Sequence, residues 1–130
     1  MSDDRRSLGA EGETQAARYL MGKRYRIAAR NVRAGGVEID LVAQKAGTLV
    51  FVEVKTRRNH DAGHPADSVH FQKQRQMTRL ALAFLRRHKL LENPTRFDVV
   101  AVTWPEHRRH PTIDYYAGAF DAGGQWQLFG

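Results

Sequence analysis

Two acidic residues and a lysine, Asp40, Glu53 and Lys55, combine residue types that can bind a metal ion and assist hydrolysis. They lie on two apolar segments, residues 37–44 and 49–56, which read as strands joined by a short turn. With a symmetric turn between these strands, Asp40 is directly opposite Glu53, and directly opposed side chains point to the same face. Glu53 and Lys55 also share that face because they are two residues apart on one strand. The three side chains are therefore expected to converge.

Two opposed carboxylates are destabilising unless a positive charge compensates them. A hard divalent cation, Mg²⁺ or Mn²⁺, bound by carboxylate oxygens would supply that charge. The alternative is a solvated polar face on which Glu38 and Lys55 form an ordinary surface pair. Glu53, however, follows an apolar run, and strands this apolar tend to be covered on both faces. A β-bulge would change the register and weaken the pairing of Asp40 with Glu53, but not that of Glu53 with Lys55.

The two expected helices add further charged residues. In the helix expected over residues 8–23, Glu13 lies on the apolar stripe and faces the sheet, whereas Glu11 points to solvent. A buried ion pair with an arginine is the alternative role for Glu13. In the helix expected over residues 69–87, Lys73 lies at the start of the apolar stripe. Lys73 is expected either to approach the site or a phosphate, or to lie at the surface with its stem against the helix.

Other ionisable residues do not form a convincing site. No pair of the six histidines combines ligand spacing with an apolar helix face, and the absence of cysteine excludes disulfides and thiolate zinc sites. Asp98 is expected to be structural, either as a cap or as the partner of Arg96.

The elements that position these residues have the order α-β-β-β-α-β-β. The helices are expected over residues 8–23 and 69–87, and the strands over 25–32, 37–44, 49–56, 96–103 and, at an edge, 112–116. A helical crossover makes the strand at 96–103 parallel to its neighbour. This order predicts one α/β domain over residues 1–130, with a mixed sheet flanked by helices. Residues 1–7 and 121–130 are expected to be peripheral tails.

The charge of the chain favours a polyanionic partner. The net charge is +7 and the isoelectric point is about 10.2. Residues 54–111 alone hold 12 basic and 5 acidic residues, an excess of 7. Such a one-sided field favours DNA or RNA, although a basic, well-solvated surface is the simpler alternative. No apolar run approaches the length of a membrane span and no leader is visible, so we expect a cytoplasmic protein without membrane contact.

The spacing of the acids also resembles a known motif. Asp40, a gap of twelve residues and Glu53-Val54-Lys55 resemble the D-Xn-E-X-K core of the PD-(D/E)XK nuclease superfamily. Within it, the chain closely resembles the YraN-like family of small bacterial predicted endonucleases. The resemblance rests on residues 12–20, 31–33, 38–42, 50–57, 73–75 and 96–100. The chain departs from the pattern in two places: Ile39 replaces the proline of the motif name, and Val37 is an extra residue before Glu38.

The resemblance implies a restriction-endonuclease-like fold and a role for each matching residue. Asp40 and Glu53 would be ligands of Mg²⁺ or Mn²⁺, Lys55 would be the catalytic lysine, and Glu13 would be the helix-borne acid of resolvase-like members. Similarity to archaeal-type Holliday-junction resolvases favours DNA over RNA and branched or structured DNA as substrate.

Basic residues near these positions are expected to hold the phosphate backbone without reading bases: Arg57, Arg58, Lys73 and Arg75. The expected activity is metal-dependent hydrolysis of phosphodiester bonds. Two alternatives are a nucleic-acid-binding protein that kept the fold without turnover and a small protein whose basic face binds an acidic partner. The sequence leaves open whether the chain is a monomer or a homodimer.

Overall fold

The computed structural model describes residues 2–58, 71–105 and 110–120. The elements are α1 (Ser2–Gly22), β1 (Arg26–Ala34), β2 (Val37–Lys45), β3 (Thr48–Arg57), α2 (Phe71–Arg87), β4 (Thr95–Thr103) and β5 (Thr112–Phe120). The five strands form one sheet in the order β1-β2-β3-β4-β5. The predicted α/β class and the order α-β-β-β-α-β-β are therefore confirmed.

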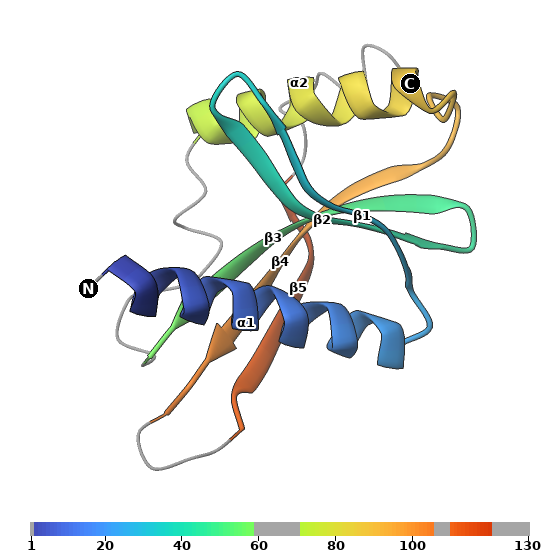
Figure 1. The fold of residues 1–130 in the computed structure, drawn as a ribbon. Coiled ribbons are helices and arrows are strands. Elements are labelled where there is room, and N and C mark those ends of the chain that lie inside the picture. Colours follow the sequence, from blue (N-terminus) through green and yellow to red (C-terminus); the bar gives the residue numbers. More distant parts are fainter. Residues whose placement is uncertain (1, 59–70, 106–109, 121–130) are drawn as a thin grey trace.

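The two helices cover opposite faces of the sheet, as Figure 1 shows. Helix α1 packs through Ala16, Ala17 and Leu20 against buried residues of β2, β3 and β4. Helix α2 packs against the other face through the stripe Met77, Leu80, Ala81 and Leu85. Both apolar stripes are the ones that helical periodicity predicts, so each helix buries its expected face.

The sheet is mixed because the chain crosses over once through α2. Strand β4 runs parallel to β3, and the other neighbouring strands are antiparallel. The parallel pairing confirms the expectation from the helical crossover. Both central strands are buried on both faces, which explains the long apolar runs at residues 49–52 and 99–102.

Helix α1 and strand β5 extend furthest beyond their predicted bounds. Helix α1 begins at Ser2 rather than at residue 8, because residues 2–7 lack the apolar periodicity on which the prediction rests. Strand β5 continues to Phe120 rather than ending at residue 116. Its pairing with β4 is irregular between Phe97 and Val99, and Gly118 adopts a φ of 61° there, so the apolar alternation is broken. The second predicted tail, residues 121–130, lies outside the described residues.

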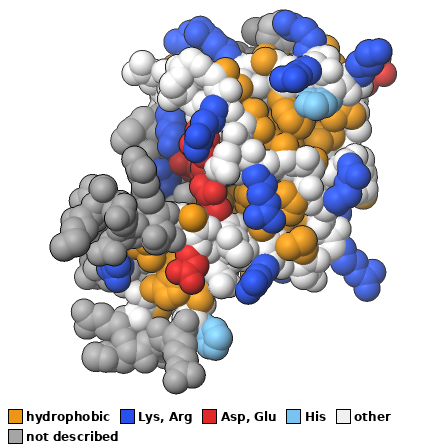
Figure 2. Space-filling model, in the orientation of Figure 1, with side chains coloured by type: hydrophobic (Ala, Val, Ile, Leu, Met, Phe, Trp, Pro, Cys, Tyr) orange, Lys and Arg blue, Asp and Glu red, His pale blue; other side chains and the backbone are white. Residues whose placement is uncertain are grey.

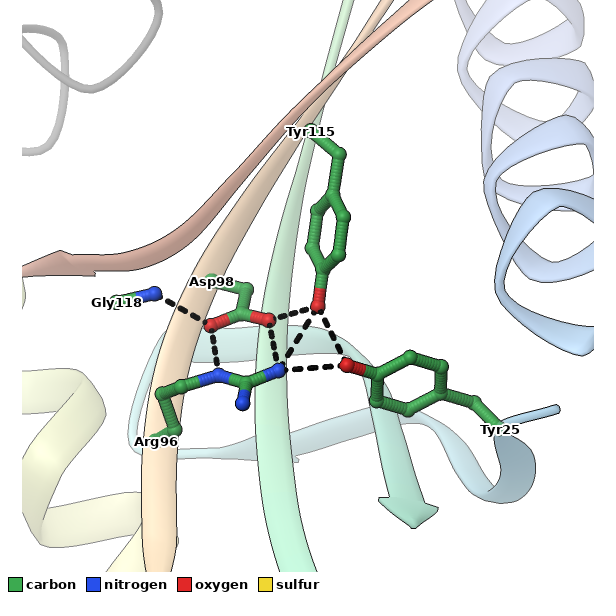
Figure 3. A network of polar contacts seen from close by, with 5 residues as sticks. All are labelled: Tyr25, Arg96, Asp98, Tyr115 and Gly118. Atoms are coloured by element: carbon green, nitrogen blue, oxygen red, sulfur yellow. Dashed lines mark hydrogen bonds and ion pairs between the residues drawn. The ribbon is translucent and has the colours of Figure 1, made fainter. Parts of the chain in front are cut away.

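A network of polar contacts joins β5 to β4 and to Tyr25, which precedes β1 (Figure 3). Asp98 is fully buried, and its carboxylate accepts two hydrogen bonds from Arg96 at 2.8 and 2.9 Å. It also accepts the Tyr115 hydroxyl and, at 2.8 Å, the backbone N–H of Gly118. Tyr25 accepts a further bond from Arg96 at 2.7 Å. The predicted pairing of Asp98 with Arg96 is confirmed. Because the Asp98 carboxylate accepts four hydrogen bonds inside the protein, its role is structural.

Neither helix of the described residues is both long and apolar enough to cross a bilayer.

Candidate active site

The β2–β3 hairpin has the predicted register up to the site and then departs from it. The ladder runs from Lys45 opposite Thr48 to Leu41 opposite Val52. The predicted next pair, Asp40 with Glu53, is not part of the ladder. Instead, Oδ2 of Asp40 accepts the backbone N–H of Val54 at 2.7 Å. The Asp40 side chain thus replaces a main-chain carbonyl at the point where the two strands separate.

The alternation of faces along β2 is interrupted at the same point. Ile39 packs in the core on the α2 face, whereas Leu41 packs in the core on the α1 face. In a regular strand, residues two apart lie on the same face. Because the phase changes at Asp40, its carboxylate lies between β2 and β3 and is close to acids from both faces of the sheet.

On the α1 side, Asn31 joins two of these acids. Its Nδ2 donates to Oε1 of Glu38 at 2.7 Å and to Oε2 of Glu13 at 3.1 Å. Asn31 adopts a φ of 51°, a left-handed conformation that asparagine tolerates better than most residues. Glu13 is half-buried and faces the sheet while Glu11 is exposed, which confirms the predicted helix face.

Glu38 pairs with β1 and not with Lys55. Arg33 lies opposite Glu38, and its Nε is 3.1 Å from Oε2 of Glu38. Burial favours the neutral form of Glu38, but hydrogen bonds from Asn31 and Arg33 outweigh it and lower the pKa of this carboxyl. The alternative of a Glu38–Lys55 surface pair is therefore not formed, because the β2–β3 ladder ends at Leu41, before it reaches Glu38.

On the α2 side, two ammonium groups hold one oxygen of Glu53. Oε1 of Glu53 lies 2.7 Å from Nζ of Lys73 and 3.3 Å from Nζ of Lys55. Glu53 is 6% exposed, so this carboxylate is compensated in a buried setting. Burial disfavours the charged form of Lys73, but the hydrogen bond and charge of Glu53 raise its pKa above the usual value. Of the two roles left open for Lys73, the structure places it at the site.

Asp40 is the least compensated acid of the group. Burial raises the pKa of Asp40 to about 8, and the charges of Glu53, Glu13 and Glu38 act in the same direction. The bond from the Val54 N–H opposes this shift but does not cancel it. A carboxylate crowded by other carboxylates either keeps its proton or takes a cation in its place.

The oxygens of this group suit a hard divalent cation. Glu13, Glu38 and Asp40 each offer one oxygen, and these oxygens all lie within 4.8 Å of one another. The predicted ligand pair was Asp40 with Glu53, so Glu38 and the linking residue Asn31 are additions from the structure. A positive φ at Asn31 carries no clear mark in the sequence, whereas an acid two residues before Asp40 was visible there.

Gly12 lets α1 approach the site. A Cβ at this position would lie 2.0 Å from Oγ1 of Thr56 on β3. Any larger residue would push the helix and the strand apart, and Glu13 is the next residue of that helix. The close approach therefore positions Glu13 beside the carboxylates of β2.

The other predicted phosphate-binding residues, Arg57, Arg58 and Arg75, differ in their contacts and exposure. Nε of Arg57 donates to Oγ1 of Thr103 on β4 at 3.1 Å. Arg58 is exposed, and Arg75 is exposed with its guanidinium 5.8 Å from the ring centre of Phe71. Acidic side chains gather between α1 and α2 on the face shown in Figure 2, with Lys and Arg side chains beside them. The carboxylates alone would repel a polyanion. With a cation bound to them, the basic side chains beside them could contact a polyanion at this site.

Comparison with known proteins identifies the family. The model of uncharacterised protein family UPF0102 matches residues 12–102. A UPF0102 protein of Geotalea uraniireducens (strain Rf4) is 46% identical over 118 residues, which cover 91% of this chain and 92% of the relative. A UPF0102 protein of Symbiobacterium thermophilum is 52% identical over 97 residues, which cover 75% of this chain and 82% of the relative. The chain therefore belongs to the uncharacterised protein family UPF0102, the YraN-like family that its sequence resembles.

Proposed function

We propose that the protein is a metal-dependent nuclease that hydrolyses phosphodiester bonds of DNA. The observation that carries this proposal is the position of Asp40, whose carboxylate is crowded by Glu13, Glu38 and Glu53 at the separation of β2 and β3. Such crowding is costly unless it serves to bind a cation. The lysine of the motif, Lys55, lies within 3.3 Å of Glu53 in the same group.

The donors fit Mg²⁺ or Mn²⁺. All of them are carboxylate oxygens, which hard divalent cations prefer. In this proposal Asp40 and Glu53 are the ligands, and Glu13 contributes from α1. Both ammonium groups bind Oε1 of Glu53, so Oε2 is left for a ligand as far as the described residues are concerned. A bound ion would lower the pKa of a water molecule and stabilise negative charge on the phosphate.

The remaining chemistry belongs to Lys55. The Lys55 side chain is half-buried, and its contact with Glu53 holds the ammonium on the same face of β3 as Glu53. From there it would orient the attacking water or donate to a phosphate oxygen as negative charge develops. Arg57, Arg58 and Arg75 would hold the backbone of the substrate on either side of the scissile phosphate.

Two further features support a nuclease of the PD-(D/E)XK superfamily. The core Asp40, Glu53 and Lys55 matches the spacing of the superfamily motif. Glu13 also lies on the first helix and reaches the carboxylates of the strands, as in resolvase-like members. The same resemblance favours branched or structured DNA as the substrate.

A cleavage panel tests the proposal. Purified protein is offered single-stranded, duplex, flap and four-way-junction DNA, and RNA, each with Mg²⁺, with Mn²⁺ and with EDTA. We expect metal-dependent cleavage of DNA, most rapid on the branched substrates, and none in EDTA. The variant Asp40→Asn serves as the control for a contaminating nuclease. Cleavage that is equal in wild type and Asp40→Asn would contradict the proposal.

One observation favours a second function, nucleic-acid binding without turnover. Lys73 and Lys55 together already supply two positive charges to Glu53. An acid neutralised in this way has no need of a metal ion for stability. Tight DNA binding without cleavage of any substrate, unaffected by Mg²⁺ and Mn²⁺, would support this alternative.

A further inference from the structure

A groove lies between the edge strand β1 and helix α2. Two adjoining hollows of about 480 and 340 Å³ form it, and they share Ala34, Leu80 and Ala83. Its apolar lining consists mainly of Val32 and Val37 from the β1–β2 hairpin and of Leu80 and Phe84 from α2. Figure 2 shows exposed hydrophobic side chains in this region, with basic side chains and a histidine around them.

The charged residues of the groove are all basic. Arg30 and Arg33 line it from β1, and Arg79 and Arg87 line it from α2. No acidic residue lines either hollow in the described part of the chain. Arg33 binds Glu38, but Arg30, Arg79 and Arg87 are exposed and have no ion pair with any described residue. Two of these guanidinium groups, those of Arg30 and Arg87, line the larger hollow and that of Arg79 lines the smaller one, which favours an anionic ligand.

The groove also presents an aromatic surface. The rings of Phe84 and His88 lie 4.4 Å apart between centres, at 44° to each other. Phe84 also makes an edge-to-face contact with the buried Phe51, with 5.8 Å between the ring centres. His88 is exposed at the end of the groove. Nucleic-acid bases stack on such rings, and arginines beside them hold the phosphates.

Two residues that line the groove also contact the candidate active site. Asn31 and Arg33 line the groove, and both donate hydrogen bonds to Glu38, one of the clustered acids. Asn31 also binds Glu13. Strand β1 therefore borders both the groove and the acids that we propose to hold the metal ion.

We infer that the β1–α2 groove binds an unpaired nucleic-acid strand and leads it to the active site, an inference that rests on the proposed nuclease function. From Gln76 to His88 the helix side is about 18 Å long at 1.5 Å per residue. That length corresponds to about five phosphates at the spacing of one DNA strand, and to fewer if the strand is extended. A duplex keeps its bases stacked inside, so only an unpaired strand can place a base on Phe84 and His88. The natural substrate would then carry a single-stranded flap or end.

Binding without metal tests the groove separately from cleavage. The affinity for a labelled oligo-dT of about 15 nucleotides is measured by fluorescence anisotropy in EDTA. Arg87→Gln is compared with Arg86→Gln, because Arg86 is the neighbouring exposed arginine in the last turn of α2 and does not line the groove. A lost phosphate contact changes the salt slope by about 0.7 for a single strand, which is about fivefold in affinity at 0.1 M salt. We expect Arg87→Gln to show this loss and Arg86→Gln to bind as wild type.

Further arms separate the outcomes. Arg79→Gln should repeat the effect of Arg87→Gln, and His88→Ala should weaken binding without changing the salt slope. Blunt duplex should be bound with the same affinity by wild type and Arg87→Gln. Equal loss in Arg86→Gln and Arg87→Gln would overturn the groove, while the nuclease proposal would still stand on the cleavage panel. Preference of the groove for an acidic peptide over oligo-dT would also overturn it.

Discussion

Oδ2 of Asp40 accepts the backbone N–H of Val54 at 2.7 Å, so a side-chain oxygen replaces the main-chain carbonyl that the neighbouring strand would otherwise offer. This bond closes the β2–β3 ladder one step after Leu41 and Val52. It fixes the Asp40 carboxylate directly beside the strand that carries Glu53 and Lys55. The same feature thus ends the regular sheet and assembles the candidate site.

The raised pKa of Asp40 predicts a pH-dependent stability. The folded protein holds this proton more tightly than the unfolded chain, because burial and the nearby acids raise the pKa from 3.8 to about 8. The stabilisation from the proton is complete below about pH 4 and is lost as the pH rises through about 8. At 1.36 kcal/mol per pKa unit, the loss is at most about 6 kcal/mol.

Melting temperatures in EDTA between pH 5 and 9 measure this effect. Asp40→Asn can still accept the Val54 N–H and carries no charge. We therefore expect the variant to be more stable than wild type at pH 8 and to lose much of the decline with pH. Parallel curves for the two proteins would show that Asp40 is ionised throughout.

Metal binding distinguishes between two sets of acids. Mn²⁺ should raise the melting temperature of wild type by mass action, and more strongly as the pH approaches 8, because the cation replaces the proton. Glu53→Gln should remove this gain. Glu38→Gln should retain most of it, since both oxygens of Glu38 already accept bonds from Asn31 and Arg33. The reverse result would assign the ion to Glu13, Glu38 and Asp40.

The acids of α1 provide a matched pair. Glu13→Gln should weaken metal binding and slow cleavage, because Glu13 lies within reach of Asp40. Glu11→Gln makes the same chemical change two residues earlier, at an exposed position. It should behave as wild type in calorimetric titration with Mn²⁺ and in the cleavage assay. Equal effects from the two variants would mean that Glu13 acts only through the net charge.

Two glycines of α1 should respond oppositely to alanine. Gly12→Ala places a Cβ 2.0 Å from Oγ1 of Thr56, so it should destabilise the fold by about 1–3 kcal/mol. Gly9→Ala meets no atom within 4 Å, and it should stabilise the helix by up to about 1 kcal/mol. Urea denaturation of both variants checks the sign. Stabilisation by Gly12→Ala would show that α1 does not depend on this close approach.

Sequence reasoning predicted the elements well because their apolar periods are regular. The stripe of α2 and the buried runs of β3 and β4 each match one period over their whole length, and the crossover then requires a parallel pair. It also predicted that Glu53 and Lys55 share a face, since β3 is regular at that point. The partner of Glu38 could not be predicted in the same way, because the phase change at Asp40 comes from tertiary contacts. The partner of Lys73 could not be predicted either, because helical periodicity gives the face on which Lys73 lies but not the carboxylate that it contacts.

Lys55 is either a catalytic residue or a structural one, and its replacement separates the two roles. Its contact with Glu53 alone would make it a structural residue, whereas the proposed function requires it in the transition state. The rate of cleavage is measured under single-turnover conditions with Mg²⁺ for wild type, Lys55→Ala and the exposed control Lys89→Ala. Melting temperature, the Mn²⁺ response and DNA affinity are measured on the same samples.

We expect Lys55→Ala to keep its fold, its Mn²⁺ response and most of its DNA affinity, and to cleave about 10²-fold or more slowly than wild type. Lys89→Ala should cleave at the wild-type rate. Cleavage by Lys55→Ala at the wild-type rate, or no cleavage by wild type under any condition, would show that Lys55 has no catalytic role in a nuclease.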